Sequence, residues 1–380
     1  MKFFDDILCQ KTKSGYSVCG DACMCERTAE GTVYVMCDGI GSGIYANIAA
    51  LTCAGRIMEL FRRGMSIRAA SEMVACSMHR ARTEDIPFSA FTAAVILPDG
   101  QFIIYTYETP SAILLQDSSA SVLKPRLYTA GHEVIGEATG TLHMGDALIL
   151  ASDGITQAGL GHGYTMGIGT EGVVAYINRS FNADEGIDKL PERIVELCAG
   201  ASEGRYEDDT TLALLHCREA NQISVLTGPP SRSAMDHDYV ETFISLPGRK
   251  VICGSTTTDI VARELGKKVE TISLGSALRT LPEYYVEGID LTTEGAIMLS
   301  QVCNILDEPK EKFVENSTAE RFCIMLKEAD VVCLLIGNAM NDAHDALLFK
   351  QIGVRVRRKA IRQIVDKLRA AGKLVTEKYY

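Results

Sequence analysis

The chain has 380 residues, of which 47% are hydrophobic, with 38 basic and 49 acidic side chains and a formal net charge of −11. This composition excludes a largely disordered chain and argues against a general nucleic-acid binder, which would normally be basic. A chain of this length typically forms two domains. The acidic excess lies in residues 1–222, with 17 basic and 28 acidic side chains, whereas residues 223–380 carry 21 of each.

The first residues and the cysteines indicate the compartment. Met1-Lys2-Phe3-Phe4-Asp5-Asp6 turns acidic where a signal peptide would need its apolar segment. Apolar runs such as Val331–Ile336 have the length of a strand and fall far short of a membrane span. Thirteen cysteines, an odd number in a long chain, fit free thiols in a reducing environment. We therefore expect a cytoplasmic protein without a membrane partner.

Residues 1–220 mix strands with helices. Short apolar stretches predict strands at 32–37, 89–97, 147–151 and 211–216. Apolar residues at helical spacing predict helices at 44–63 and 66–82, and Gly64 marks the end of the first. Because strands and helices do not alternate regularly, this part is predicted to be an α+β domain of layered sheet and helices.

A polar stretch at 218–224 separates this part from a smaller domain at 225–380. There the pattern predicts strands at 250–253, 269–274, 331–336 and 373–379, and helices at 256–265, 294–306, 318–328 and 357–371. The more regular alternation predicts an α/β domain with a mostly parallel sheet.

Two segments of the first domain place an Asp-Gly pair at the end of an apolar strand. Asp38-Gly39 and Asp153-Gly154 each put a carboxylate where the following glycine lets the backbone turn sharply. Asp208-Asp209 reverses the order and precedes the strand at 211–216. If that strand runs antiparallel to the other two, all three acidic ends meet at one edge of the sheet.

Buried carboxylates at such an edge would repel each other, so the pattern predicts bound cations. Ligands that are all oxygen atoms favour Mg²⁺ or Mn²⁺ over zinc. Asp21, which follows Gly20, is a fourth candidate ligand. A single Asp-Gly pair is more often a simple turn, and the prediction therefore rests on the ordered set.

The ordered set resembles the three signatures of the metal-dependent serine/threonine phosphatases of type 2C. These residues are Asp38-Gly39-Ile40-Gly41-Ser42-Gly43, Ser152-Asp153-Gly154 and Asp208-Asp209-Thr210-Thr211. Their glycine-rich form is similar to the bacterial sporulation stage II E (SpoIIE-like) branch, over about residues 1–220. The resemblance implies a β-sandwich flanked by helices that hydrolyses phosphoserine or phosphothreonine on a partner protein. It also implies a homodimer whose core helices, those at 44–63 and 66–82, set the geometry of the metal site.

The resemblance assigns a dinuclear Mn²⁺ or Mg²⁺ site whose bound water attacks phosphorus. Asp38 would bridge both ions, and Asp153 and Asp208 would complete the catalytic set. The implied metal ligands are Asp21, Asp38, the Gly39 carbonyl, Asp153 and Asp208. Asp209 falls where the family places a structural polar residue.

Two further groups near these motifs have more than one interpretation. Lys13 is a candidate contact for the substrate phosphate or an ordinary solvated lysine. Cys19, Cys23 and Cys25 share strand parity with Asp21, which would place them on its face of a regular strand. A redox switch or soft-metal site is one interpretation, and core packing is the commoner role of cysteine.

The second domain offers a candidate ligand site where a strand leads into a helix. Free backbone amides at Gly254, Ser255 and Thr256 would suit a phosphate or carboxylate. Thr256 and Asp259 have the spacing of a capping box, which would satisfy such amides without a ligand. After the strand at 331–336 comes a polar group, favoured as a surface loop over a metal site: Asn338, Asn341, Asp342, His344 and Asp345.

The end of the chain is strongly basic. Residues 355–373 hold eight basic side chains against Asp366 alone. A solvated face, or docking on the acidic first domain, is favoured there over nucleic-acid binding. The alternative to an enzyme is a catalytically weak signalling scaffold whose second domain binds a small anion or a protein partner. The four aspartates favour the enzyme, because a scaffold would not need them.

Overall fold

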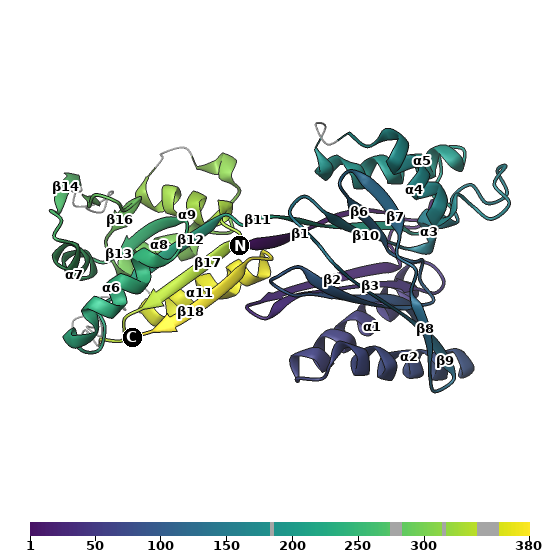
Figure 1. Cartoon of the computed structure of the whole chain (residues 1–380), viewed down its shortest axis with the longest axis horizontal. Helices are drawn as coiled ribbons and strands as arrows, with labels where there is room; N and C mark the ends of the chain where they lie inside the picture. The colour runs from purple at the N-terminus through teal and green to yellow at the C-terminus, as the bar shows by residue number, and fades with distance from the viewer. Residues whose placement is uncertain (183–185, 274–282, 314–316, 340–356) are drawn as a thin grey trace. The chain divides into compact units, whose positions relative to one another are not determined.

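The structure is a computed structural model that describes the chain except residues 183–185, 274–282, 314–316 and 340–356. It forms two compact units (Figure 1). The first comprises Met1–Glu26 and Glu30–Glu219, and the second comprises Arg27–Ala29 and Ala220–Tyr380.

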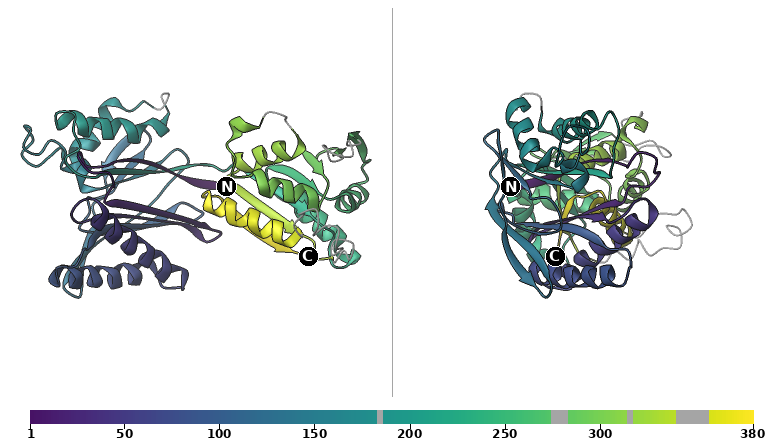
Figure 2. Two further views of the ribbon diagram at one scale, coloured as in Figure 1. Left: turned by 180° about the vertical axis from the view of Figure 1, so that it is seen from behind. Right: turned by 90° about the vertical axis from the view of Figure 1, so that its right-hand side faces the viewer.

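The first unit packs two antiparallel sheets face to face, with helices on both outer surfaces (Figures 1 and 2). One sheet has six strands in the order β2-β3-β4-β5-β9-β8, with bounds β2 Asp21–Thr28, β3 Gly31–Gly39, β4 Ser89–Ile96, β5 Gln101–Tyr107, β8 Arg126–Ala130 and β9 Glu133–Thr141. The other has five in the order β1-β11-β10-β6-β7, with bounds β1 Lys2–Lys11, β6 Ile113–Gln116, β7 Ser119–Val122, β10 Ala147–Ala151 and β11 Thr210–Glu219.

Helices cover the outer face of each sheet. Those packed on the six-stranded sheet are α1 Ile44–Arg62 and α2 Ile67–Thr83. Those on the five-stranded sheet are α3 Asp153–Thr156, α4 Gly169–Ser180, the short turn η2 Ile187–Lys189 and α5 Leu190–Ala201. The predicted α+β sandwich and the first two helices are confirmed, whereas sequence periodicity missed α4 and α5.

Alternation along β3 shows which side chains lie between the sheets. Val33, Val35 and Cys37 pack against α1 and α2. Tyr34 and Met36 pack in the apolar layer between the two sheets. Because successive strand residues point to opposite faces, Asp38 continues the series that faces the five-stranded sheet.

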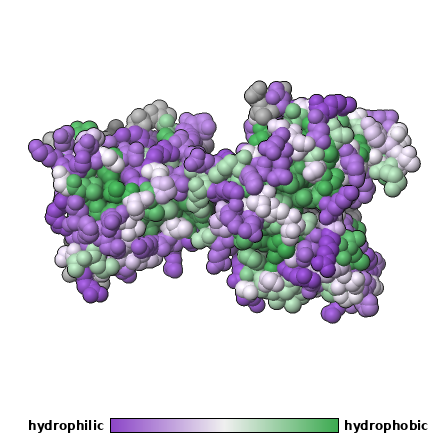
Figure 3. Space-filling view, viewed as in Figure 1, coloured by the Kyte–Doolittle hydropathy of each residue, from purple (hydrophilic) through white to green (hydrophobic). Residues whose placement is uncertain are grey.

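Helix α1 is unusually apolar. Among the described residues it alone is long and apolar enough to cross a membrane, by length and composition. One side of it packs on the six-stranded sheet through residues such as Ala50, Cys53 and Ile57, all fully buried. These contacts identify α1 as a core helix of the first unit. On the face of the molecule seen in Figure 3, hydrophilic residues surround separate apolar patches.

The second unit is a seven-stranded sheet with helices on both faces, and its strand order is β14-β15-β16-β13-β12-β17-β18. The bounds are β12 Gln222–Thr227, β13 Arg249–Cys253, β14 Glu270–Ser273, β15 Glu283–Tyr285, β16 Leu291–Thr293, β17 Val331–Ile336 and β18 Leu374–Tyr379. The five strands from β16 to β18 in this order pair in parallel, and β15 pairs antiparallel with both its neighbours. The predicted mostly parallel sheet is confirmed.

Among the described residues, two helices pack on one face of this sheet and three on the other. The first group is α6 Asp236–Ser245, preceded by η3 Ser233–Met235, and α7 Ser255–Leu265. The second group is α8 Ala296–Ile305, α9 Thr318–Glu328 and α11 Arg357–Ala370, with the turn η4 Lys310–Lys312 between α8 and α9.

The predicted capping box at the start of α7 is wrong. The helix begins one residue earlier than predicted, and its N-cap is Gly254, which makes no side-chain hydrogen bond to the helix. Thr256 is therefore already inside the first turn, where it cannot act as the cap. Of the other predicted polar residues, Asn341, Asp342, His344, Asp345 and Arg355 lie outside the described residues. Two basic side chains near the end, Lys367 and Lys373, donate hydrogen bonds to carbonyls of the same unit.

Candidate metal centre

The Asp-Gly pairs sit at points of very close backbone approach. A Cβ added to Gly39 would lie 2.0 Å from the carbonyl oxygen of Ala46 in α1. A Cβ added to Gly154 would lie 2.2 Å from the carbonyl oxygen of Asp209. Since no side chain fits at either position, glycine is what allows each carboxylate-bearing strand end to approach its neighbour.

The acidic strand ends come from two sheets, which corrects the predicted arrangement at the edge of one sheet. Asp21 and Asp38 belong to β2 and β3 of the six-stranded sheet. Asp153 follows β10, and Asp208 precedes β11, in the five-stranded sheet. β10 and β11 run antiparallel, so the Asp153 and Asp208 ends of these strands do meet as predicted. The carboxylates meet because the two sheets are stacked, with Asp38 facing across the layer between them.

Asp209 has a structural role beside this group. It is 4% exposed, and its two carboxylate oxygens accept hydrogen bonds from the backbone amides of Lys13, at 2.9 Å, and Gly20, at 2.8 Å. The residue therefore fixes the segment that leads into β2, next to Asp21. Both of its oxygens are used in this way, which leaves Asp208 as the better placed of the pair for a ligand.

Ser152 joins the two strand ends of the five-stranded sheet. Its hydroxyl accepts a hydrogen bond from the amide of Thr211 at 2.9 Å and donates to the carbonyl of Asp209 at 3.3 Å. It is completely buried. Sequence reasoning treated Ser152 as part of a motif and did not predict this contact, which holds the Asp153 and Asp208 segments together.

Asp21 is the most unusual group of the site. It is 3% exposed, and within the described part of the chain neither of its carboxylate oxygens has a hydrogen-bond partner. Burial is the main cause that raises the pKa of Asp21 to about 7, and the charges of Asp209 and Asp153 contribute to the rise. The nearby hydroxyls of Thr211 and Ser152 act to lower it. A buried carboxylate with both oxygens unpartnered fits a cation ligand.

Asp38 and Asp208 share the same electrostatic environment. Burial, followed by the charges of Asp21, Asp153 and Asp208, raises the pKa of Asp38 to about 9. Burial also raises the pKa of Asp208, although its contact with the amide of Asp209 and the charge of Lys13 oppose this. Mutual repulsion among these carboxylates shows that they lie within electrostatic reach of one another.

The carboxylates do not close around a common point. Within the part of the chain that the structure describes, no three His, Cys, Asp or Glu side chains form a ready-made ligand set for a metal ion. Asp153 is held by Gln157, whose side-chain amide donates to it at 2.8 Å. Like-charged groups gain nothing from close approach without a cation between them.

Lys13 lies at the site, where it pairs with Asp208. Its ammonium is 3.5 Å from a carboxylate oxygen of Asp208, and its side chain is 30% exposed. This places it within reach of a substrate at the acidic group, as predicted, and also gives it the role of an ion-pair partner. Its function as a phosphate contact stays a prediction.

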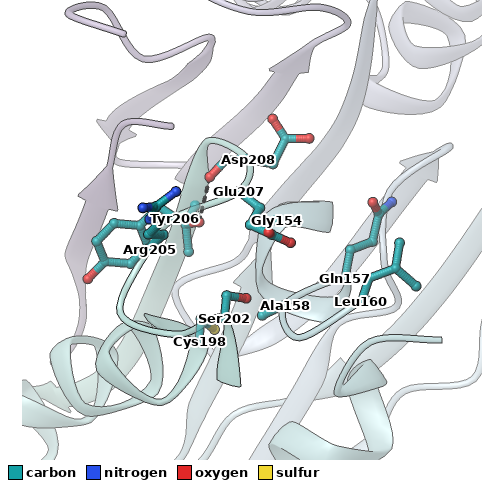
Figure 4. Close-up of a pocket in the computed structure, with 11 residues that line it drawn as sticks. Gly154, Gln157, Ala158, Leu160, Cys198, Ser202, Arg205, Tyr206, Glu207 and Asp208 are labelled. Atoms are coloured by element: carbon teal, nitrogen blue, oxygen red, sulfur yellow. Dashed lines mark hydrogen bonds between the residues drawn. The ribbon is translucent and has the colours of Figure 1, made fainter. Parts of the chain in front are cut away.

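A cavity of about 210 Å³ in the first unit lies beside the acidic site, with Asp208 in its lining (Figure 4). Arg205, Tyr206, Glu207 and Asp208, from the segment before β11, line one side, and Gln157 and Leu160 lie on the other. Sequence reasoning sought a basic residue only upstream of Asp38 and missed Arg205. Its position three residues before Asp208, in the same loop, was the available signal.

The cysteines near Asp21 are packing residues. Cys19 precedes β2, which corrects its predicted place on the strand, and Cys23 and Cys25 pack against the apolar layer between the sheets. Burial raises the pKa of Cys23 to about 12 and raises that of Cys19 as well. Thiols held in the protonated form are poor nucleophiles and poor metal ligands, which favours the packing interpretation.

Two stacked antiparallel sheets flanked by helices, with Asp-Gly strand ends converging from both, define a type 2C phosphatase domain. Residues 28–218, half of the chain, match the family described as Stage II sporulation protein E (SpoIIE). The chain belongs to this family, whose members carry a serine phosphatase domain of this type. No curated protein matches the chain.

Several solved structures are similar to part of this chain. The phosphatase domain with a fragment of the regulatory domain of SpoIIE from Bacillus subtilis is 17% identical, with a TM-score of 0.48, and the match covers 57% of this chain and 64% of that one. The RsbU and RsbW domains of Rv1364c from Mycobacterium tuberculosis are 18% identical, with a TM-score of 0.49, covering 63% and 68%. RsbX in complex with magnesium is 17% identical, with a TM-score of 0.41, covering 57% and 100%. The chain thus spans less than two thirds of the first of these.

Proposed function

We propose that the first unit is a metal-dependent protein phosphatase that hydrolyses phosphoserine or phosphothreonine on a partner protein. The observation that carries this proposal is the convergence of four carboxylates from both sheets, one of them buried with both oxygens unpartnered. These are Asp21, Asp38, Asp153 and Asp208. Buried carboxylates whose pKa values are raised by burial and by one another's charge are stabilised when divalent cations bind.

The donor set consists of oxygen atoms, which suits two Mn²⁺ or Mg²⁺ ions. The resemblance adds the Gly39 carbonyl to this set, and its oxygen lies near Asp21, 3.5 Å from where a Cβ on the preceding Gly20 would be. Oxygen ligands without nitrogen or sulfur favour hard ions. When bound, the ions would lower the pKa of a coordinated water and offset charge on the phosphoryl oxygens.

The chain itself supplies positioning at this site. Gln157 orients Asp153, and Asp209 fixes the backbone that presents Asp21. Lys13 lies beside Asp208, and Arg205 lines the adjoining cavity. We infer that these two cations attract the phosphorylated side chain and hold its oxygens for in-line attack.

The proposal is tested by hydrolysis of a phosphoserine peptide and of p-nitrophenyl phosphate with Mn²⁺. Asp38→Asn and Asp153→Asn should each lower turnover on the order of a hundredfold or more, because each removes a cation ligand. Both should also reduce the rise in melting temperature that Mn²⁺ produces in the wild type. The matched control is Asp117→Asn, which removes an exposed carboxylate from a turn whose positive φ of 47° asparagine tolerates.

Three outcomes would contradict the phosphatase proposal. They are absence of Mn²⁺-dependent turnover, turnover unchanged in both site variants, and an equal loss in Asp117→Asn. Absence of turnover combined with retained Mn²⁺ binding would favour the alternative of a catalytically weak signalling scaffold.

We also propose that the exposed apolar side of α1 packs against a second copy of the chain. Four large apolar side chains of this helix are well exposed: Ile44 at 61%, Tyr45 at 76%, Ile48 at 54% and Leu51 at 45%. Light scattering coupled to size exclusion should give the mass of a dimer, and Ile48→Glu should give that of a monomer. A monomeric wild type at micromolar concentration would contradict this.

A further inference from the structure

The second unit contains a cavity at the carboxyl ends of its parallel strands. It has a volume of about 260 Å³ and opens where β12, β13 and β16 lead into the following segments. Open α/β sheets place ligands at this edge. At roughly 30 Å³ per water, the space holds about nine waters, enough for a small metabolite.

Two helices begin at this cavity, and neither is capped by a side chain. The N-caps of α7 and α8 are Gly254 and Gly295, and neither glycine has a side chain that could bond the first amides of its helix. A Cβ on Gly295 would lie 3.5 Å from the Cα of Gly254, so the two helix starts lie next to each other. Residues of both first turns line the cavity. Each helix start carries a partial positive charge of roughly half a unit.

An independent observation points to a ligand at this position. Thr257, in the first turn of α7, lines the cavity and is 1% exposed. Its hydroxyl has no hydrogen-bond partner among the residues that the structure describes. The same oxygen lies 3.3 Å from where a Cβ on Gly254 would be, on the side where the two helix starts meet. A buried hydroxyl without a partner costs roughly 1–3 kcal/mol, which a bound acceptor would recover.

A largely buried arginine completes the positive lining. One guanidinium nitrogen of Arg357 donates to the carbonyls of Gly337 at 2.7 Å and Ala339 at 3.3 Å, which fixes the side chain. Gly228 makes room for it, since a Cβ there would lie 1.9 Å from the other terminal nitrogen. Burial lowers the pKa of Arg357, which is the effect of desolvating a cation.

The charges of the lining indicate the class of ligand. Two helix starts and one guanidinium supply about two positive charges, and Glu294 in the same lining offsets one of them, so the lining stays net positive and suits an anion. Helix starts and a guanidinium are groups that bind phosphate oxygens. The Glu294 carboxylate accepts a hydrogen bond from Tyr284 at 2.8 Å. A carboxylate at this wall favours a ligand whose other end carries a hydroxyl group.

We propose that this cavity binds a small phosphate monoester, with its phosphate at the starts of α7 and α8 beside Thr257 and Arg357 and its hydroxylated end toward Glu294. This function belongs to the second unit and does not depend on phosphatase activity in the first.

The test is calorimetric titration of the full chain in EDTA, which removes cations from the first unit and with them any phosphate held there. Ribose 5-phosphate is the principal probe, inorganic phosphate tests the anion alone, and ribose and malate test the hydroxyls and a dicarboxylate. Ribose 5-phosphate should bind with a dissociation constant of about 1 mM or tighter. Inorganic phosphate should bind more weakly, and ribose and malate should give no heat.

Two variants locate the site. Thr257→Val keeps the shape of the side chain and should weaken binding roughly three- to tenfold, and Arg357→Gln at least about tenfold. The matched control is Arg263→Gln, which removes an exposed guanidinium at the other end of α7 and should leave binding unchanged. The proposal is overturned by the absence of heat up to about 10 mM of both phosphates, by malate binding as tightly as ribose 5-phosphate, or by wild-type affinity in Thr257→Val and Arg357→Gln.

Discussion

Replacing Asp21 with asparagine tests whether this carboxylate destabilises the protein when no cation is bound. Burial raises its pKa from an ordinary 3.8 to about 7, a difference that corresponds to something on the order of 4 kcal/mol. The folded protein holds this proton more tightly than the unfolded chain does. The corresponding stability is therefore fully present below pH about 4 and is lost as the pH rises through about 7.

Asparagine removes the charge but leaves its amide without partners, at a cost of roughly 1–3 kcal/mol. In EDTA at about pH 8.5, Asp21→Asn should therefore be more stable than the wild type by roughly 1–3 kcal/mol. For a domain of this size, this corresponds to a rise in melting temperature of roughly 2–10 °C. At about pH 5 the wild-type carboxylate is protonated, so the gain should disappear.

Thermal unfolding of the full chain at both pH values gives this comparison, and the transition of the first unit is the one that Mn²⁺ shifts in the wild type. With Mn²⁺ present the order should reverse, because the variant lacks a ligand. Equal melting temperatures at about pH 8.5 in EDTA, or the same gain at both pH values, would refute the reasoning.

Three further predictions concern the surroundings of the site. Gly154→Ala should lower stability by about 1–3 kcal/mol or more and reduce Mn²⁺-dependent turnover, because its Cβ would meet a carbonyl oxygen at 2.2 Å; an unchanged denaturant midpoint would contradict the close approach. Asp209→Ala should cost about 2–4 kcal/mol in the same assay, since it strips partners from the amides of Lys13 and Gly20. Cys23, whose pKa is raised to about 12, should resist iodoacetamide in the native protein at about pH 8, and labelling as fast as in urea would refute its burial.

Local features of the sequence were sufficient to predict the carboxylate-bearing strand ends. An apolar strand that ends in Asp-Gly indicates both a buried strand and a sharp turn, and the structure shows why glycine is required at Gly39, where α1 passes at van der Waals distance or less from any added Cβ. The predicted bounds of α1 and α2 are confirmed to within one or two residues, because the spacing of their apolar residues and the glycine after α1, Gly64, are local signals.

Helix capping was harder to predict. The Thr256–Asp259 spacing satisfies the capping-box pattern, yet the helix starts at Ser255 and Gly254 is its N-cap. Spacing alone does not determine at which residue the strand ends and the helix begins. The positive φ of 123° at Gly254 fixes that point, since it turns the chain in a conformation that threonine would adopt only with strain. The absence of a cap at α7, which matters for the proposed ligand, is therefore a property that only the backbone reveals.

Sheet membership could not be predicted for a related reason. Strand β3 is apolar on both faces, with Val33 and Val35 toward the helices and Tyr34 and Met36 toward the other sheet. A strand of this kind shows no hydrophobic alternation, so the sequence does not say which face Asp38 takes. Once the two sheets stack, the alternation of side chains along β3 determines which face Asp38 takes. Asp38 follows Met36 by two residues and inherits its direction, which brings its carboxylate across the layer toward the strand ends that carry Asp153 and Asp208. The four carboxylates thus lie close together because the two sheets pack face to face. Their charges repel one another until a cation binds between them.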